Sequence, residues 1–360
     1  MKSPISIIAG KTALAVIRDE GLKPDRVRVV IGAAGGPKWL ILGGLDRALF
    51  GSFFRKRKKP LFLLGSSIGS WRFAAVSRKD PVAAIDRFEA AYLGQYYSRM
   101  PSTDEVSEAS WKILDDYLDE RGADEALSHR YIRLNMLAVR SKNVFRGLSR
   151  PALAAGMVAA TLSNIVSRSA MGLFFDRTLF YDPREKPPFF DMDGFRIHRV
   201  PLSKSNIRKA VMASGSIPLV MNGVSAIPGA PAGVFRDGGM IDYQMDITAD
   251  PDPARIVLYP HYTDTVIPGW LDKHLSWRNA SEQSMDNVLI VCPSREFIQG
   301  LPYGKIPDRN DFMKFHGRDG ERIAYWKKTI EGGRILAGAF MDAVDSGGIR
   351  SMARLYTPGR

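Results

Sequence analysis

A serine lies at the centre of the stretch Gly65-Ser66-Ser67-Ile68-Gly69, which directly follows the apolar run 61–64. A Gly-x-Ser-x-Gly pattern between a strand and a helix holds its serine on a sharp turn, where the hydroxyl can meet a substrate. That hydroxyl becomes an effective nucleophile only when a base takes its proton. The pattern therefore predicts a nucleophile at Ser67, and a polar residue in an ordinary loop stays the alternative.

Two glycines, Gly35 and Gly36, follow an earlier apolar run in the stretch "GAAGGPKW". Acyl transfer needs hydrogen-bond donors aimed at the oxyanion that forms, and glycine amides can approach it closely. In a parallel sheet this loop and the serine turn would share the C-terminal edge, where such sheets bind ligands. A phosphate-binding P-loop would need glycine at 37 and serine or threonine at 39; Pro37 and Trp39 exclude it.

The stretch "FRDGGMIDY" offers a base for the serine, because Asp237 stands at the end of a short expected strand. Gly238 and Gly239 follow it and leave its carboxylate uncrowded. An Asp-Gly-Gly turn with a purely structural role is the alternative for this segment.

Taken together and in this order, these stretches resemble the patatin-like phospholipase family. The residues that carry the resemblance are Gly35-Gly36-Pro37-Lys38, Gly65-x-Ser67-x-Gly69, the segment "ASGSIP" at 213–218, and Asp237-Gly238-Gly239. The resemblance covers roughly residues 27–245. Ala34 replaces the first glycine of the family's usual triple, Trp39 stands where glycine is usual, and the family's Asn and Pro after Asp-Gly-Gly are absent.

The resemblance implies a serine lipid acyl hydrolase of the phospholipase A or esterase type, with a Ser–Asp dyad and an acyl-serine intermediate. Ser67 would be the nucleophile and Asp237 the general base. Gly35, Gly36 and the amide of Ile68 would form the oxyanion hole, and Lys38 falls on the family's Arg/Lys position, where it would contact substrate. The implied fold is α/β: a three-layer α/β/α arrangement with a mainly parallel central sheet and extra helices, including a helical C-terminal tail.

Two other functions stay open. Ser67, Asp237 and His261 follow the chain order of an α/β-hydrolase triad, which would make the protein a Ser-Asp-His esterase. Against this, the serine turn follows only about two strands and the glycine loop lies close to it. The third interpretation is a catalytically silent patatin-like scaffold that binds lipid or protein, which the intact Ser67 and Asp237 argue against.

Apolar periodicity places these motifs in one α/β domain over residues 1–360, with the motif-bearing core at about 27–245 and C-terminal strands and helices in 246–360. The residues before 22 are expected to form an amphipathic helix through Ile8, Leu14, Ala15 and Ile17. Further strands are expected at 26–36, 60–67, 131–140, 177–183, 233–237, 254–260 and 287–293, and helices at 37–54, 68–78, 80–130, 203–216 and 310–350. The apolar segment 151–175, with Phe174, Phe175 and Phe180, could line an acyl-chain pocket or form an ordinary core helix.

The chain carries a net charge of +13, which favours an anionic partner. The densest basic run is 55–59, read either as a solvated turn or as a contact with anionic lipid headgroups. It precedes the strand that leads to Ser67, so it should face away from the active edge. A lipid or ester substrate is expected, peripheral contact with an anionic membrane stays open, and no specific nucleic-acid partner is expected because no nucleic-acid module accompanies the charge.

Composition sets the remaining expectations. Cys292 is the single cysteine, expected to be buried and inert, so no internal disulfide can form. Five histidines show no metal-ligand spacing, and neither a metal nor a cofactor is expected. Because neither a secretory signal nor a membrane span is evident, a cytoplasmic location is expected, with peripheral membrane association open. The sequence indicates neither the oligomeric state nor the acyl-chain preference.

Overall fold

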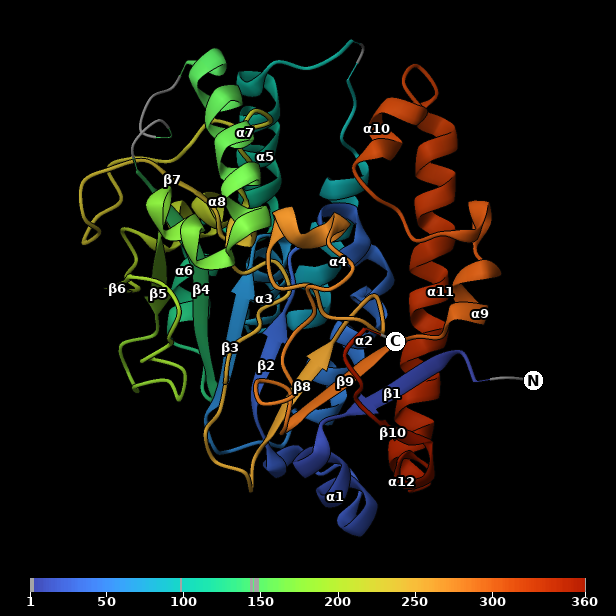
Figure 1. Cartoon of the computed structure of the whole chain (residues 1–360). Coiled ribbons are helices and arrows are strands. Elements are labelled where there is room, and N and C mark those ends of the chain that lie inside the picture. Colours follow the sequence, from blue (N-terminus) through green and yellow to red (C-terminus); the bar gives the residue numbers. More distant parts are fainter. Residues whose placement is uncertain (1–2, 98, 143–144, 146–148, 360) are drawn as a thin grey trace.

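The computed structural model describes residues 3–97, 99–142, 145 and 149–359, and it centres on one sheet of ten strands. The strand order is β10-β1-β9-β8-β2-β3-β4-β5-β6, and β7 pairs with β4 beside this path. Six of the pairings are parallel and three are antiparallel (β1 with β9, and β4 with β5 and β7). Helices cover both faces of the sheet (Figure 1), so the expected mainly parallel three-layer α/β/α fold is confirmed.

The strands are β1 Ile5–Ala9, β2 Val27–Gly32, β3 Leu61–Ser66, β4 Ile132–Ser141, β5 Phe175–Tyr181, β6 Ile197–Pro201, β7 Phe235–Asp237, β8 Ile256–Pro260, β9 Val288–Pro293 and β10 Ala353–Leu355. The α-helices are α1 Lys11–Glu20, α2 Gly43–Ala48, α3 Ile68–Val76, α4 Pro81–Leu93, α5 Thr103–Tyr117, α6 Glu120–Leu127, α7 Arg150–Val166, α8 Ile207–Gly215, α9 Arg295–Gln299, α10 Asn310–Lys314, α11 Asp319–Asp345 and α12 Ile349–Met352. Shorter helical turns are η1 Pro24–Arg26, η2 Gly36–Ile41, η3 Leu49–Phe53, η5 Arg168–Leu173, η6 Gly238–Met240, η7 Trp270–His274 and η8 Pro302–Gly304.

The central strands β2, β3, β4, β8 and β9 consist almost entirely of buried residues. Near-continuous apolar runs are typical of parallel strands with both faces covered, and this explains why the sequence pattern found them. Between β2 and β3 the chain makes a helical crossover, and β3 leads directly into α3. The carboxyl ends of both strands therefore meet at one edge of the sheet, as the sequence predicted.

The N-terminal segment differs from the expectation. Ile8 belongs to strand β1, and the amphipathic helix α1 begins only at Lys11. Gly10 lies between the strand and the helix. Only glycine fits there, because a Cβ would collide with the backbone carbonyl of Met285. The expectation of one helix over this region was wrong since it merged a buried five-residue strand with the helix behind it.

Residues outside the motif-bearing core complete the same sheet. Strands β8 and β9 extend it beyond β2, β1 and β10 form its far edge, and the long helix α11 packs against α2. The division of the chain into domains stays a prediction. Cys292 lies fully buried in β9, as expected. Within the described residues, we find no helix that is both long enough and apolar enough to span a membrane.

Candidate active site

Ser67 occupies the tight turn that joins strand β3 to helix α3. Its backbone is left-handed at φ 53°, ψ −126°, a conformation that is rare for a residue with a side chain. The flanking glycines permit this turn because α3 passes very close to the sheet. A Cβ on Gly65 would lie 2.5 Å from the amide nitrogen of Ser70, and one on Gly69 would collide with the carbonyl oxygen of Gly32. The predicted strand-turn-helix element is therefore present at its predicted position.

Asp237 lies directly beside this serine. The hydroxyl of Ser67 donates to Asp237 Oδ2 at 2.6 Å, across 170 positions of sequence. The backbone amide of Gly239 donates to the other carboxylate oxygen, Oδ1, at 2.7 Å. Gly238 is needed at its position because a Cβ there would collide with the carbonyl oxygen of Leu137 in β4. The structure thus brings together the two side chains that the sequence analysis singled out.

The carboxyl group of Asp237 is buried, and this burial raises its pKa above the usual value. The positive charge of Arg309, the hydrogen bonds from Ser67 and Gly239, and the charge of Lys273 act in the opposite direction. A carboxylate with a raised pKa accepts a proton more readily than an exposed one. The arrangement can therefore remove the proton of the Ser67 hydroxyl.

Three amides around the serine have no assigned acceptor. Within the described chain, none of the backbone hydrogen bonds uses the N–H of Gly35, Gly36 or Ile68. Gly36 (φ 56°) and Ile68 line the same cavity as Ser67, and a Cβ on Gly35 would lie 2.8 Å from the ring of Tyr262. Amide donors at such a position can stabilise the oxyanion of a tetrahedral intermediate. Their role as an oxyanion hole stays a prediction.

A buried serine in the segment 213–218 supports the turn. The Ser67 amide donates to Ser214 Oγ at 2.9 Å, and Ser214 Oγ in turn donates to the carbonyl of Leu137 at 2.6 Å. The hydroxyls of Ser70 and Ser214 share a further hydrogen bond of 2.8 Å. Ser214 therefore ties together α8, the turn and strand β4. The sequence analysis noted this segment only as part of the family pattern.

A cavity of about 290 Å³ opens beside Ser67. Its apolar lining comes from Trp71, Tyr92, Met100, Val106, Ile113, Met221 and Phe312. These residues belong to α3, α4, α5, α10 and the loops that follow α4 and α8. None of the residues that line this cavity belongs to 151–175, so the cavity does not support the acyl-pocket alternative for that segment. The segment forms α7 instead, while Phe175 and Phe180 are buried in β5.

Three cationic side chains lie near one another in this region, and two of them, Arg309 and Lys273, act on the charge of Asp237. Lys38 lies with its Nζ 5.0 Å from the ring centroid of Tyr262, beside the glycine loop. Arg309 lines both the Ser67 cavity and a small recess that contains Asp237, and Lys273 Nζ lies 4.2 Å from the ring of Tyr243, in that recess. Sequence analysis missed Arg309 and Lys273, because single cations in a chain with 51 lysines and arginines carry no signal.

His261 takes no part in the contact between serine and carboxylate. It is fully buried, its Nδ1 is within hydrogen-bond distance of the Thr263 carbonyl oxygen (2.7 Å), and burial lowers its pKa to about 3. Since Ser67 meets Asp237 directly, no imidazole lies between them. The structure therefore does not assemble the Ser-Asp-His arrangement. Among the described residues we also find no cluster of three or more His, Cys, Asp or Glu suited to a metal ion.

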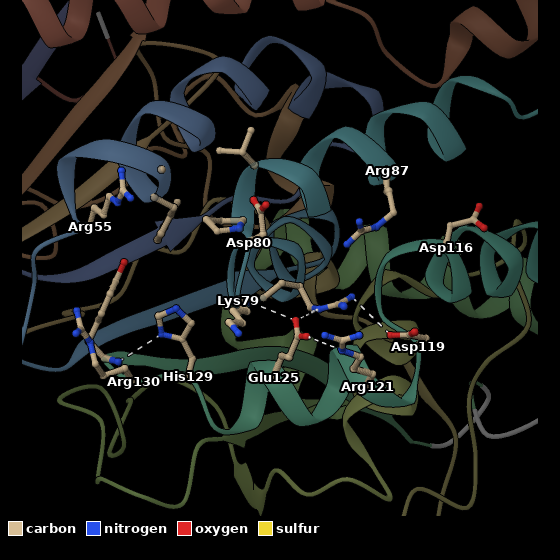
Figure 2. Close-up of a pocket in the computed structure, with 16 residues that line it drawn as sticks. Arg55, Lys79, Asp80, Arg87, Asp116, Asp119, Arg121, Glu125, His129 and Arg130 are labelled. Carbon is tan, nitrogen blue, oxygen red and sulfur yellow. Dashed lines mark hydrogen bonds and ion pairs between the residues drawn. The ribbon is translucent and has the colours of Figure 1, made fainter.

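A larger cavity, of about 880 Å³, lies at the other end of the central strands (Figure 2). Arg55, from the basic run, and Arg130 border it just before β3 and β4 begin, so this cavity faces away from Ser67, as expected for that run. Several of its charges pair with one another, as with Arg78 Nε and Glu125 Oε2 at 2.8 Å. Within the run Arg57 is buried and bonds backbone carbonyls, which corrects its reading as part of a wholly solvated turn.

Comparison with known proteins yields little. No protein-family model matches the chain, and no curated protein matches it. Among solved structures, the chain is similar to the crystal structure of VipD from Legionella pneumophila, with 12% identity and a TM-score of 0.31. The match covers 65% of this chain and 50% of that one, so the chain spans about half the length of VipD. We draw nothing about function from a similarity at this level.

Proposed function

We propose that the protein is a serine acyl hydrolase of the patatin-like type, which cleaves carboxylic esters of lipids through Ser67 and Asp237. The observation that supports this most is the 2.6 Å hydrogen bond from the Ser67 hydroxyl to Asp237, made on a left-handed strand-to-helix turn. The amides of Gly35, Gly36 and Ile68 and the apolar cavity beside the serine add to this support.

In the proposed reaction, Ser67 Oγ attacks the ester carbonyl while its proton passes to Asp237. The carbonyl oxygen becomes an oxyanion held by the glycine-loop amides and the Ile68 amide. When the C–O bond breaks, the alcohol leaves with the proton from Asp237, and an acyl-serine remains. Water then attacks this ester and gives a proton to Asp237. When the bond between the acyl carbon and Ser67 Oγ breaks, Asp237 returns that proton to Oγ, which releases the fatty acid and restores the free serine and the carboxylate. A single oxyanion donor is worth about 3 kcal/mol in such reactions.

The apolar cavity suits one acyl chain. At about 290 Å³ it lies just below the usual range for ligand pockets, roughly 300–1,000 Å³. Its walls are mostly aromatic and aliphatic, so it offers an acyl chain the burial that drives apolar binding. A cytoplasmic location and peripheral contact with an anionic membrane stay predictions from the sequence.

Labelling with a fluorophosphonate probe tests the proposal, since such probes react with activated serines. We expect the wild-type protein to be labelled and to hydrolyse p-nitrophenyl butyrate. Ser67→Ala should abolish both, and Asp237→Asn should reduce both strongly because the base is lost. Ser66→Ala is the matched control: this neighbouring hydroxyl is buried and has no hydrogen-bond partner, so its loss should leave labelling intact. Absence of labelling in the folded wild type would favour a silent scaffold.

A further inference from the structure

Three positively charged side chains from distant parts of the sequence lie near one another, and two of them, Arg309 and Lys273, act on the proposed base Asp237. Lys38 follows the glycine loop, Lys273 lies in η7, and Arg309 immediately precedes α10. Arg309 packs directly against the glycine loop, because a Cβ built on Gly36 would lie only 3.0 Å from the Nε of Arg309. Arg309 also lines both the cavity of Ser67 and the recess of Asp237.

These cations lack a carboxylate partner in the described part of the chain, where neither a side-chain ion pair nor a side-chain hydrogen bond involves any of the three. Nearby acids are already engaged. Asp237 accepts from Ser67 and Gly239, and Asp308 pairs with Lys305 at 2.9 Å. By contrast, two fully buried arginines elsewhere are each matched to an aspartate. These pairs are Arg72 with Asp46, at 2.6 Å, and Arg177 with Asp242, at 2.7 Å.

The grouping places like charges close together. Lys273 is exposed at the surface, with its Nζ over the rings of Tyr243 and Trp270. Its pKa is lowered to about 7 by desolvation and then by the positive charges of Arg309 and Lys38, while Asp237 and Asp308 act in the opposite direction. Burial also lowers the pKa of Lys38, with Lys305 and Arg309 acting in the same direction and Asp308 opposing them. Unpaired cations held together in this way repel one another. Asp237 and Asp308 offset part of this repulsion, but neither forms an ion pair with any of the three cations. An anion placed among them would relieve the rest.

We propose that Arg309, Lys38 and Lys273 form a binding subsite for an anionic group on the alcohol part of the ester, a phosphate or a carboxylate. This inference rests on the proposed function. The acyl chain has its own apolar cavity, and Arg309 lines both that cavity and the recess of Asp237, which places its guanidinium beside the alcohol part of the ester. A guanidinium can bind either anion through two parallel hydrogen bonds, which gives direction as well as strength.

Three butyrate esters with the same acyl chain test this subsite: 1-butyrylglycerol, 1-butyrylglycerol 3-phosphate and 3-butyryl-glycerate, with release of butyrate as the readout. The first is neutral, the second carries a phosphate and the third a carboxylate. We expect kcat/KM for at least one anionic ester to exceed that of the neutral ester by about tenfold or more, as a charged hydrogen bond allows. The better of the two anionic esters identifies the group that the subsite accepts.

The variants assign the preference to residues. The quantity to compare is kcat/KM for the preferred anionic ester divided by kcat/KM for the neutral ester. Arg309→Gln should bring this ratio towards one, and Lys273→Met should lower the ratio, with most of the change in KM. Arg99→Gln is the matched control, because Arg99 lines the same cavity but pairs with Glu105 at 3.0 Å; its ratio should stay at the wild-type value. Circular dichroism at the assay temperature checks that each variant is folded.

The outcomes separate the two proposals. Hydrolysis of none of the esters, together with absent fluorophosphonate labelling, would overturn the proposed function. Equal kcat/KM for all three esters would overturn the anionic subsite and leave the dyad in place. A preference that survives in both Arg309→Gln and Lys273→Met would also overturn the subsite.

Discussion

Replacing Ser214 with alanine should damage both the stability of the protein and the reactivity of its nucleophile. The Ser214 hydroxyl is fully buried and has three partners: the amide of Ser67, the carbonyl of Leu137 and the hydroxyl of Ser70. In the Ser214→Ala variant the amide, the carbonyl and the second hydroxyl each lose their hydrogen bond to the Ser214 side chain. A buried polar group left unpaired costs about 1–3 kcal/mol, so the free energy of unfolding should fall by about 2–4 kcal/mol.

The effect on reactivity follows from the backbone of Ser67. A residue held in a rare conformation stores about 1–3 kcal/mol, and it keeps this conformation only while its surroundings enforce it. The bond from its amide to Ser214 is one such restraint. If that restraint is worth about 1.4–2.8 kcal/mol, its loss slows the reaction of Ser67 roughly tenfold to a hundredfold.

Ser216 provides a matched control two residues along the same segment. Its hydroxyl is equally buried, but it donates only to the carbonyl of Met212 one turn back in its own helical segment. Ser216→Ala should cost about 1 kcal/mol or less and leave the reactivity of Ser67 unchanged. Urea unfolding followed by circular dichroism gives the stabilities, and the second-order rate of fluorophosphonate labelling, measured where every variant is folded, gives the reactivity. Equal stabilities and equal labelling rates for the two variants would refute this reasoning.

Two further predictions concern the charge at the site and the packing beneath it. The acid limb of kcat/KM is expected above pH 3.8, because burial raises the pKa of Asp237 and its protonated form cannot act as a base. Arg309 lowers that pKa, so Arg309→Gln should move the acid limb to higher pH; a profile that stays in place would contradict this. Gly69→Ala should cost several kcal/mol in urea unfolding, because its Cβ would collide with the backbone of β2. Gly338→Ala, at an open position of α11, should stabilise by about 0.5–1 kcal/mol, and similar effects of the two changes would count against the packing argument.

The sequence predicted best the elements that are buried in the sheet and that end next to a glycine. Strands β2 and β3 are largely apolar runs that end in or near glycine. Close packing dictates both glycines: a Cβ on Gly65 would meet the backbone of Ser70, and one on Gly32 would meet the ring of Phe73. Asp237 could be found because β7 ends at that residue and two glycines follow. In each case the constraint is local, so it leaves a mark within a few residues of sequence.

The elements that the sequence could not supply depend on tertiary contacts. Strand β10 has only three residues, two of them exposed, and it exists because β1 offers it a parallel partner. The cavity beside Ser67 draws its walls from helices and loops separated by more than 200 positions, such as those of Val106 and Phe312. Arg309 reaches the glycine loop across a similar separation, and nothing in its neighbours distinguishes it from other surface arginines.

The meeting of Ser67 and Asp237 depends on a strand that carries neither of them. β4 pairs in parallel with β3, placing Leu137 opposite Ser66, and it pairs antiparallel with β7, placing Ala138 opposite Asp237. Two consecutive residues of one strand thus set the positions of both halves of the dyad, and the carbonyl of Leu137 also holds Ser214. A slip of one residue in either pairing would turn the side chains of that strand to the other face of the sheet. β4 contributes here through its backbone and register and not through a reactive side chain. The apolar pattern at 131–140 therefore predicted the strand but not its part in positioning the dyad.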